Sequence, residues 1–389
     1  MLRKFFRFIG YFTATVILLV SLIILFSGRW YLYKGVWYTY LHGRGGPSAT
    51  EYQIFENRKV EALDPKKIAH SEKYNSAQLP HDVDSIFRTF EAHAFVIVRN
   101  DSLLHEQYWD GYGDTSHTNG FSIAKTYCSV LLGCALKDGF IKNLDEPVSK
   151  YISEFSVGEK AKITLRHLVT MTSGIAFNES YISPFAYPAE GYYGSDVLKA
   201  SCAYDVGEAP GKIFRYLSGN SALLGICISK AVGKPLSQYL SERLWKDLNC
   251  EQPAWWSLDK KDGQEKGFCC LNSNPIDFAR IGILYLNNGK WNGKQIVDSD
   301  YVSNSIVPFD CAEDDGSKNK TYGYNWWLTE YNGMKVFYAR GILGQHVICV
   351  PDKKMVIVKL SRKRRPKSGK FHYPDDVGTC IQAAIDMYH

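Results

Sequence analysis

The chain opens with an uninterrupted apolar run that differs from everything after it. Residues 8–28 carry no charged side chain over 21 positions, and residues 16–26 are almost wholly aliphatic. At about 1.5 Å of rise per residue, a helix of this length crosses a hydrocarbon core of roughly 30 Å. The pattern therefore predicts one N-terminal transmembrane helix, contained in a membrane anchor at residues 1–34. No comparable apolar run follows it.

The flanks of this run indicate its orientation and its fate. Arg3, Lys4 and Arg7 precede it, which favours a cytoplasmic N-terminus and a single-pass protein whose main domain is periplasmic or extracellular. Secretion after signal cleavage is the alternative, although a signal peptide has an apolar stretch of about 7–15 residues and a small-x-small cleavage site. The run here is longer and ends at 27–31 (SGRWY), where Trp30 is typical of an interfacial aromatic belt.

Beyond the anchor, the pattern of polar and apolar positions divides the chain in two. Residues 35–80 are polar, rich in turn formers and weakly periodic, which is typical of a stalk and an irregular lead-in. Residues 81–389 carry the alternating and helical patterns of one folded domain. Strands are predicted at both ends of that domain, at 93–98, 103–108, 322–328, 335–339, 346–350 and 355–360.

Helical patterns fill the middle of the domain and its end. They are predicted at 122–137, after Thr164, at 221–232, at 236–248, from Asn274 and Pro275 onward, and at 375–387. Strands at both ends with helices between and after them favour a single α+β domain whose sheet joins the two ends.

Composition and charge exclude several classes of function. Hydrophobic residues make up 45% of the chain and charged residues 22%, as in ordinary globular proteins. The net charge of +6 comes without the interleaved aromatic residues of a nucleic-acid surface, so no nucleic-acid partner is expected. The ten cysteines form no C-x-x-C, and the adjacent Cys269 and Cys270 lack zinc-site spacing, so no metal or cofactor is expected. Outside the cytoplasm some cysteines would pair, and the sequence leaves the pairing open.

Three Ser-x-x-Lys matches are candidates for nucleophilic chemistry. Those at 257–260 and 317–320 lie in polar loops, whereas Ser122 and Lys125 open the apolar helix 122–137. Their spacing puts both side chains on one helix face, and a helix N-terminus favours negative charge on the serine oxygen. A packed helix would also strip water from the lysine and disfavour its charged form. The alternative is an N-cap serine beside a snorkelling lysine.

Two further segments favour chemistry over packing alone. Tyr216 stands in the turn 210–220, where a tyrosine beside a cation could relay a serine proton. Glycines at both ends of 341–344 would let the backbone approach a bound acyl group and present an N–H as an oxyanion donor.

At these positions the chain resembles the β-lactamase-related serine hydrolases, which include class C β-lactamases, D-alanyl-D-alanine carboxypeptidases and esterases. The likeness covers about residues 80–389 and is carried by FSIAK (121–125), TLRHLVTMTSG (164–174), YLS (216–218) and IDFARIG (276–282). Within that family the chain looks most similar to the 6-aminohexanoate-dimer hydrolases, through SGIAFNESY (173–181), GILGQ (341–345) and IVKLS (357–361).

The resemblance implies a β-lactamase/transpeptidase-like fold, with an antiparallel sheet and helices on its faces, and a role for each matching residue. Ser122 would be acylated, and Lys125 and Tyr216 would form the proton-transfer pair. The N–H groups of Ser122 and Ile342 would form the oxyanion hole. The residues that would bind substrate are Tyr181, Trp327, Ser218 and Asn220, although either aromatic residue could instead belong to the core.

Departures from the family pattern narrow the expected activity. The Lys-Thr-Gly type of motif, which helps to hold a substrate carboxylate, is replaced by 338–340 (YAR), which argues against efficient β-lactam hydrolysis. Leu343 is apolar where the 6-aminohexanoate branch would have a polar residue, which argues against a nylon-oligomer substrate. We therefore expect a membrane-anchored serine hydrolase acting on small or peptide-like amides or esters. The alternatives are a penicillin-binding carboxypeptidase or β-lactamase, and a non-catalytic binding or sensing relative.

Overall fold

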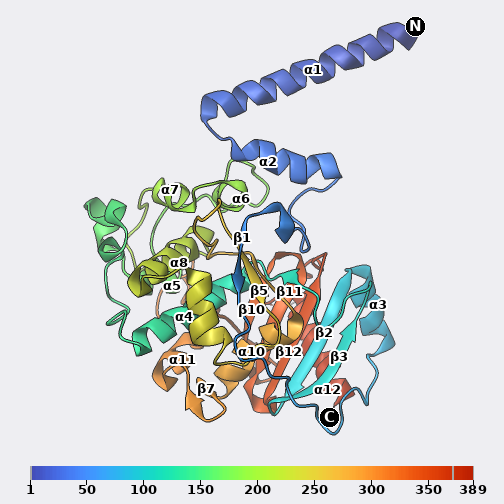
Figure 1. Cartoon of the computed structure of the whole chain (residues 1–389), viewed down its shortest axis with the longest axis vertical. Helices are drawn as coiled ribbons and strands as arrows, with labels where there is room; N and C mark the ends of the chain where they lie inside the picture. The colour runs from blue at the N-terminus through green and yellow to red at the C-terminus, as the bar shows by residue number, and fades with distance from the viewer. Residues whose placement is uncertain (1, 370–371, 389) are drawn as a thin grey trace.

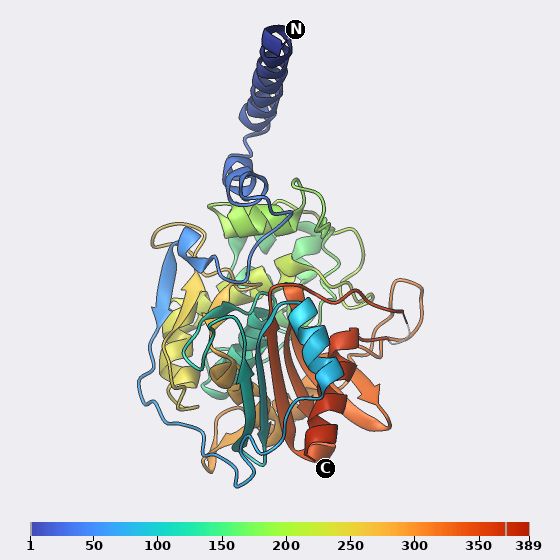
Figure 2. The ribbon, with the colours of Figure 1, turned by 90° about the vertical axis from the view of Figure 1, so that its right-hand side faces the viewer.

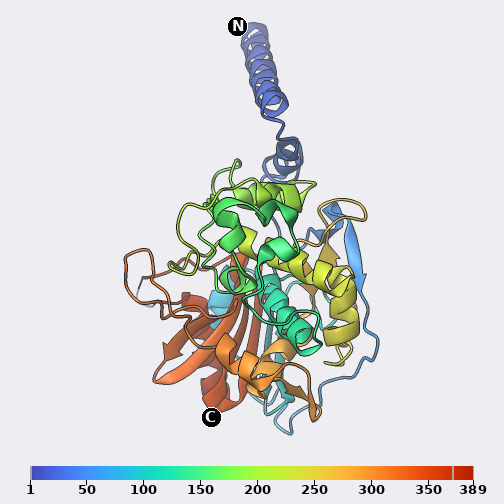
Figure 3. The same ribbon diagram turned by 90° about the vertical axis from the view of Figure 1, so that its left-hand side faces the viewer.

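The N-terminal apolar segment is a helix that projects from the rest of the molecule. The computed structural model describes residues 2–369 and 372–388. Helix α1 (Leu2–Ser27) leaves the domain in all three views, and the C-terminus lies at the opposite end (Figures 1, 2 and 3). Among the described helices it alone has the length and hydropathy to cross a membrane, a test that a signal sequence also meets. Almost all of its side chains are exposed.

The other strands lie mostly towards the two ends of the domain, and most of the helices lie between them. The helices are α2 (Tyr31–Tyr38), α3 (His81–Thr89), α4 (Ile123–Lys137), α5 (Leu165–Val169), α6 (Tyr187–Tyr193), α7 (Val197–Cys202), α8 (Ser218–Val232), α9 (Leu236–Leu240), α10 (Pro275–Leu286), α11 (Ser299–Ser305) and α12 (Asp375–Met387). The strands are β1 (Asn57–Val60), β2 (Ala92–Arg99), β3 (Ser102–Tyr108), β4 (Thr118–Asn119), β5 (Ala254–Ser257), β6 (Leu271–Ser273), β7 (Lys290–Trp291), β8 (Lys294–Gln295), β9 (Trp327–Tyr331), β10 (Met334–Gly341), β11 (Gln345–Val350) and β12 (Met355–Ser361).

One sheet joins the two ends of the domain. In the described residues it has six strands in the order β3-β2-β12-β11-β10-β9, and every neighbouring pair is antiparallel. Strand β2 from the start of the domain pairs with β12 from its end, with Val96 opposite Val358. The predicted α+β class, with an antiparallel sheet joining both ends, is confirmed.

Alternate residues of the sheet enter two separate hydrophobic cores, because successive side chains of a strand point to opposite faces. Phe95 and Ile97 of β2 pack in the smaller core, with α3 and α12, which lie across one face of the sheet in Figure 2. Val96 and Val98 face the larger core, which contains α4, α8 and α10. Helix α4 is therefore buried along almost its whole length, which holds its first turn rigidly.

The strand predicted at 322–328 begins only at Trp327. Asn325 adopts the left-handed conformation, with φ of 55°. Its side-chain amide donates to the Lys125 carbonyl at 2.9 Å, and its own carbonyl accepts the Thr126 hydroxyl at 2.8 Å. Residues 322–326 thus form a turn that is hydrogen-bonded to the first turn of α4. Because of these bonds they do not pair with the sheet.

Residues 35–80, expected to be a stalk and irregular lead-in, pack against the domain. Helix α2 lies against α6, and the Tyr31 hydroxyl donates to the Pro184 carbonyl at 3.0 Å. Strand β1 is the edge of a second sheet, ordered β1-β5-β6-β4 in the described residues. Its polar sequence gave no strand signal, because an edge strand can keep a charged side chain such as Lys59 at the surface.

Two predicted helix caps are confirmed, whereas one predicted long helix is interrupted. Thr164 and Asn274 cap their helices by accepting a backbone N–H from the first turn. The helix predicted at 236–248 ends as α9 at Leu240 and continues as a π-helical turn. There the Ser241 hydroxyl donates to the Ser237 carbonyl at 2.9 Å, a back-bond that competes with regular helical pairing.

Candidate active site

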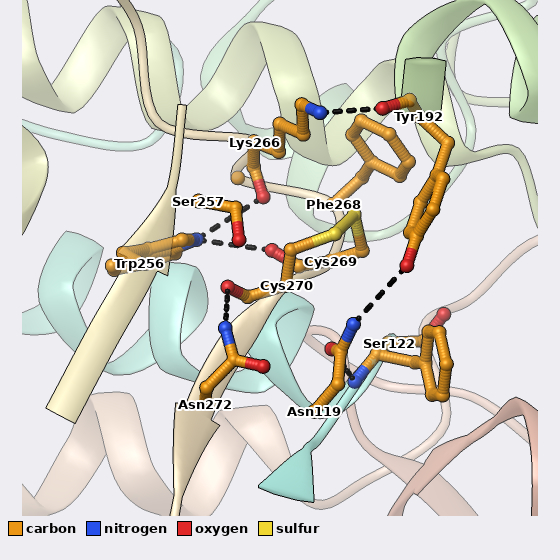
Figure 4. The surroundings of a disulfide bond; sticks show 12 residues. Asn119, Ser122, Tyr192, Trp256, Ser257, Lys266, Phe268, Cys269, Cys270 and Asn272 are labelled. Carbon is orange, nitrogen blue, oxygen red and sulfur yellow. Dashed lines mark hydrogen bonds between the residues drawn. A yellow bond between two sulfur atoms is a disulfide. The ribbon is translucent and has the colours of Figure 1, made fainter. Parts of the chain in front are cut away.

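Ser122 sits at the N-terminus of α4, directly after a strained turn. Phe121 has φ of 45°, and its N–H donates to the Asn119 side-chain oxygen at 2.8 Å. Figure 4 shows Asn119 beside Ser122. Within the described part of the chain, the Ser122 N–H has no hydrogen-bond acceptor. This turn therefore leaves both the hydroxyl and the N–H of Ser122 available at a helix end that favours negative charge.

Lys125 faces Ser122 from the same side of α4. Its Nζ donates to the Ser122 Oγ at 2.9 Å and to the Phe268 carbonyl at 2.9 Å, and the residue is only 1% exposed. The sequence predicted the pair but not the Phe268 carbonyl, because a backbone acceptor distant in sequence leaves no pattern. The serine of a competing match, Ser257, instead donates its hydroxyl to Asn57 at 2.8 Å.

Tyr216 lies beside this pair in a cluster of aromatic rings. The Lys125 Nζ is 5.1 Å from the centroid of the Tyr216 ring. The ring centroids of Trp327 and Tyr322 are 5.0 Å and 5.8 Å from that of Tyr216. Trp327 also lies under the Arg340 guanidinium at 4.2 Å. The structure thus brings Tyr216 to the Ser–Lys pair and places Trp327 behind it.

Glu179 organises the start of α8, which begins earlier than the predicted residue 221. Its carboxylate accepts the Ser218 N–H at 2.8 Å and the Ser218 hydroxyl at 2.5 Å, and it also accepts the Tyr181 hydroxyl at 2.9 Å. A carboxylate is favourable at a helix N-terminus. Burial of the hydroxyl, followed by the charges of Glu179 and Tyr216, raises the pKa of Tyr181 well above its usual value, although its ring is half exposed.

Sequence patterns gave Glu179 no role, because its partner Ser218 is remote in the chain. This contact also changes the role expected of Ser218, which was predicted to bind substrate. Its hydroxyl is directed at the carboxylate, so this serine fixes the loop that carries Tyr181 while still lining the cavity described below.

Asn220 is fully buried and ties α8 to a neighbouring turn. Its side-chain oxygen accepts the Ser173 hydroxyl at 2.6 Å, and its amide nitrogen lies 3.6 Å from the Met171 sulfur. Its predicted role in substrate binding gains no support from this placement.

Ile342 is brought next to the nucleophile by a close backbone approach. It opens a single 3₁₀ turn, Ile342–Gly344, directly after β10. A Cβ added at Gly341 would lie 2.3 Å from the carbonyl oxygen of Gly120, two residues before Ser122. Only glycine therefore allows the end of β10 to reach the turn that carries Ser122.

The side chains of Ser361 and Gln345 fix the 3₁₀ turn by hydrogen bonds. Leu343 has a positive φ of 63°, and its carbonyl accepts the Ser361 hydroxyl at 2.8 Å. The Gln345 amide donates to the Ser361 carbonyl at 2.6 Å. Gln345 and Ser361 close the two sequence stretches that carry the resemblance near the C-terminus, and their contacts explain why both polar residues stand there.

The residues around Ser122 line a cavity with about 930 Å³ of empty space, part of it open to solvent. Of the residues expected to act together, four line this cavity: Ser122, Tyr181, Ser218 and Ile342. The other four are not among its lining residues: Lys125, Tyr216, Trp327 and Asn220. Residues of α2, residues 180–184 and residues of α6 complete the lining. No described residue of this lining is Asp, Glu, Lys, Arg or His.

A disulfide between the adjacent Cys269 and Cys270 directly follows Phe268 (Figure 4), whose carbonyl accepts a hydrogen bond from Lys125. The Trp256 indole donates to the Cys269 carbonyl at 3.0 Å. Lys266, fully buried, donates its Nζ to the Tyr192 carbonyl, and burial lowers the pKa of Lys266 well below its usual value. These contacts fix the segment whose Phe268 carbonyl meets Lys125. The other described cysteines are free.

The chain is similar in sequence and in fold to known hydrolases. A family model described as Beta-lactamase matches residues 83–377. A 6-aminohexanoate-dimer hydrolase from Paenarthrobacter ureafaciens is 24% identical over 306 residues, 72% of this chain and 74% of that protein. A Bacillus anthracis protein assigned as a 6-aminohexanoate-dimer hydrolase superposes with a TM-score of 0.74 at 23% identity, covering 87% of this chain and 92% of its own. A family VIII carboxylesterase gives 0.62 at 14% identity, covering 82% and 99%. The structural likenesses show a shared fold.

Proposed function

This chain belongs to the beta-lactamase family, and from that premise we propose that it is a membrane-anchored serine hydrolase that cleaves amide or ester bonds through an acyl-enzyme on Ser122. The family and the β-lactamase/transpeptidase-like fold expected from the sequence are confirmed. The observation that carries the proposal is the 2.9 Å contact between the Lys125 Nζ and the Ser122 Oγ at the start of a buried helix. Hydrolases and esterases among the similar proteins support serine hydrolysis.

The proposed reaction has two steps. The Ser122 Oγ attacks the carbonyl carbon while its proton passes to the Lys125 and Tyr216 pair, which then gives a proton to the leaving alcohol or amine. Water hydrolyses the acyl ester in the second step. The N–H groups of Ser122 and Ile342 stabilise the tetrahedral oxyanion. The unpaired Ser122 N–H and the close approach at Gly341 support this assignment.

The character of the cavity favours neutral substrates. A carboxylate-bearing β-lactam needs a cation to hold its charge, and the described lining of the cavity contains none. The residues before Gly341 also lack the Lys-Thr-Gly pattern that holds such a carboxylate in the family. An uncharged amide or ester is therefore the preferred substrate class.

The anchor is proposed from α1 and its flanks. Its exposed apolar side chains need a bilayer or a partner to cover them, and the positive charges at Arg3, Lys4 and Arg7 favour a cytoplasmic N-terminus. The disulfide Cys269–Cys270 fits a domain on the oxidising, non-cytoplasmic side. Extraction of membranes with sodium carbonate tests the anchor. Full-length protein that stays with the membranes supports it, whereas release of a shortened chain supports cleavage and secretion.

Labelling with a fluorophosphonate probe tests the nucleophile. We expect the full-length protein in detergent to be labelled and Ser122→Ala to be unlabelled and inactive on p-nitrophenyl acetate. Ser317→Ala removes the exposed serine of another Ser-x-x-Lys match and should keep both activities. Undiminished hydrolysis by Ser122→Ala would refute the assignment. Lasting acylation of Ser122 by a labelled penicillin would favour a penicillin-binding carboxypeptidase instead.

A further inference from the structure

The cavity at Ser122 runs to the helix that follows the membrane anchor. Tyr31, Leu32 and Val36 of α2 line this cavity together with Ser122. Helix α1 ends at Ser27, so only residues 28–30 separate the proposed membrane span from this wall. Figure 1 shows α2 and α6 at the end of the domain from which α1 emerges. The active site therefore opens at the membrane-proximal end of the domain.

Helix α2 is held in place as part of the cavity. Tyr31 and Leu32 are buried, and the Tyr31 hydroxyl donates to Pro184. A Cβ at Gly35 would lie 3.4 Å from the Tyr193 ring of α6, so the two helices are in contact along this wall. The Arg29 guanidinium lies 5.2 Å from the centroid of the Phe185 ring. These contacts hold the segment next to the anchor against α6 and against residues 184 and 185, at the end of the loop that lines the cavity.

Exposed apolar side chains surround this end of the domain. Ile182, which lines the cavity, is 93% exposed, and it stands among further exposed apolar side chains. A group of exposed apolar residues, unlike a single one, marks an interaction or membrane surface. We name these residues the apolar collar; they are Trp30, Tyr33, Trp37, Tyr40, Leu41, Ile182 and Phe185. The collar comes from the two segments that flank the cavity, so one bilayer surface could cover the collar and the cavity mouth together.

We propose that the substrate is an amphiphile of the bilayer whose aliphatic acyl chain occupies the cavity between Ser122 and α2. This inference rests on the proposed acyl-enzyme chemistry and names its substrate class. The Ser122 Oγ forms a bond to the acyl carbon, the bond from that carbon to the headgroup oxygen or nitrogen breaks, and the headgroup leaves with the serine proton. Water then releases a fatty acid and restores the serine hydroxyl.

Because the cavity wall is uncharged, the gain in kcat/KM with each added methylene of the acyl chain can be estimated. Each methylene transferred from water to an apolar site gains about 0.8 kcal/mol, or about fourfold in kcat/KM where the burial is complete. A short acetyl group would use only the part of the cavity next to Ser122. Esters with longer chains should therefore react faster, up to the length that the cavity accepts.

Chain-length preference in detergent tests the cavity. We expect kcat/KM of the full-length protein for p-nitrophenyl esters to rise at least tenfold from two to eight acyl carbons. Val36→Trp fills the wall at α2 and should reduce the octanoate-to-acetate ratio at least tenfold, whereas Val157→Trp, at an exposed site outside the cavity, should not change it. If the protein hydrolyses the acetate ester but kcat/KM does not rise with chain length, the inference is wrong while the proposed function stands. The same holds if Val36→Trp lowers kcat/KM equally for acetate and octanoate. If wild type neither hydrolyses any ester nor reacts with a fluorophosphonate, the proposed function fails instead.

Delivery from the bilayer is tested with protein in vesicles of ether-linked phosphatidylcholine, which contains no acyl ester. A fluorogenic long-chain ester is placed either in the same vesicles or in separate ones. We expect hydrolysis at least tenfold faster in the shared vesicles. Equal rates would show that the substrate enters from water, and the bilayer part of the inference would be wrong.

Discussion

The close approach of Gly341 to the turn before Ser122 can be tested by adding a single methyl group. In Gly341→Ala the new Cβ would lie 2.3 Å from the Gly120 oxygen, whereas ordinary contacts begin at 3.4 Å. The end of β10 must then retreat by about 1 Å, and the Ile342 N–H moves with it. Misplacement of this size can cost about 100-fold in rate, and loss of one oxyanion donor costs roughly 100-fold to 1,000-fold in kcat.

We therefore expect Gly341→Ala to lower kcat by about 100-fold to 1,000-fold while KM changes little, because the donor acts mainly in the transition state. The assay is steady-state hydrolysis of p-nitrophenyl butyrate by full-length protein in detergent, with thermal unfolding as the check on the fold. Gly113→Ala is the matched control, since nothing lies within 4 Å of its added Cβ. Ile342→Pro, which deletes the N–H itself, should show a similar loss. A folded Gly341→Ala protein within threefold of the wild-type kcat would refute the oxyanion assignment.

The remaining predictions concern the groups around the nucleophile and one buried histidine. Tyr216→Phe should lower kcat by about 100-fold to 10,000-fold with little change in Tm, because the ring packing stays; kinetics within threefold of wild type would exclude proton transfer by this hydroxyl. Glu179→Gln weakens charge-assisted bonds at the start of α8 and should destabilise the protein by about 1–3 kcal/mol in urea, so an unchanged midpoint would contradict its capping role. Reduction of Cys269–Cys270 by excess dithiol should lower kcat reversibly, because it loosens the segment whose Phe268 carbonyl contacts Lys125. Alkylation and mass spectrometry would confirm that both thiols are free. An unchanged kcat in that reduced protein would argue against the prediction. Burial, followed by the charges of nearby cations, lowers the pKa of His93 to about 3. The neutral ring therefore contributes stability that is present above about pH 6.5 and is lost as the pH falls towards 3, by about 2 kcal/mol between pH 7 and 5. His93→Gln should remove this part of the pH dependence. An identical slope of the unfolding free energy against pH in the variant would refute the assignment.

The parts of the site that could be predicted depend on local patterns. Ser122 and Lys125 are three residues apart on one helix, so their encounter follows from helix geometry and the apolar sequence after them. The caps at Thr164 and Asn274 follow from the same local logic. That one sheet joins the two ends of the domain could also be predicted, because strands at both ends of a domain have few other partners.

The parts that were missed depend on contacts between distant segments. The Phe268 carbonyl and Glu179 reach Lys125 and Ser218 through the fold, and nothing near them in sequence indicates those partners. Residues 322–326 form a turn instead of the predicted strand, because the Asn325 side chain donates a hydrogen bond to the Lys125 carbonyl in α4. Helix α2 was not predicted, and its residues were divided between the anchor at 1–34 and the lead-in at 35–80, because its packing partner α6 lies far along the chain.

The pairing of β2 with β12 sets the order in which this protein can mature. Val96 and Val358 are neighbours in the middle of the sheet, so the sheet cannot close until nearly the whole chain has left the ribosome. Helix α1 is synthesised first, and in an anchored protein it already holds the unfinished chain at the membrane surface. Until β12 arrives, one edge of the apolar strand β2 is open to pairing with other chains. Yield in cells should therefore depend on how quickly the last part of the message is translated.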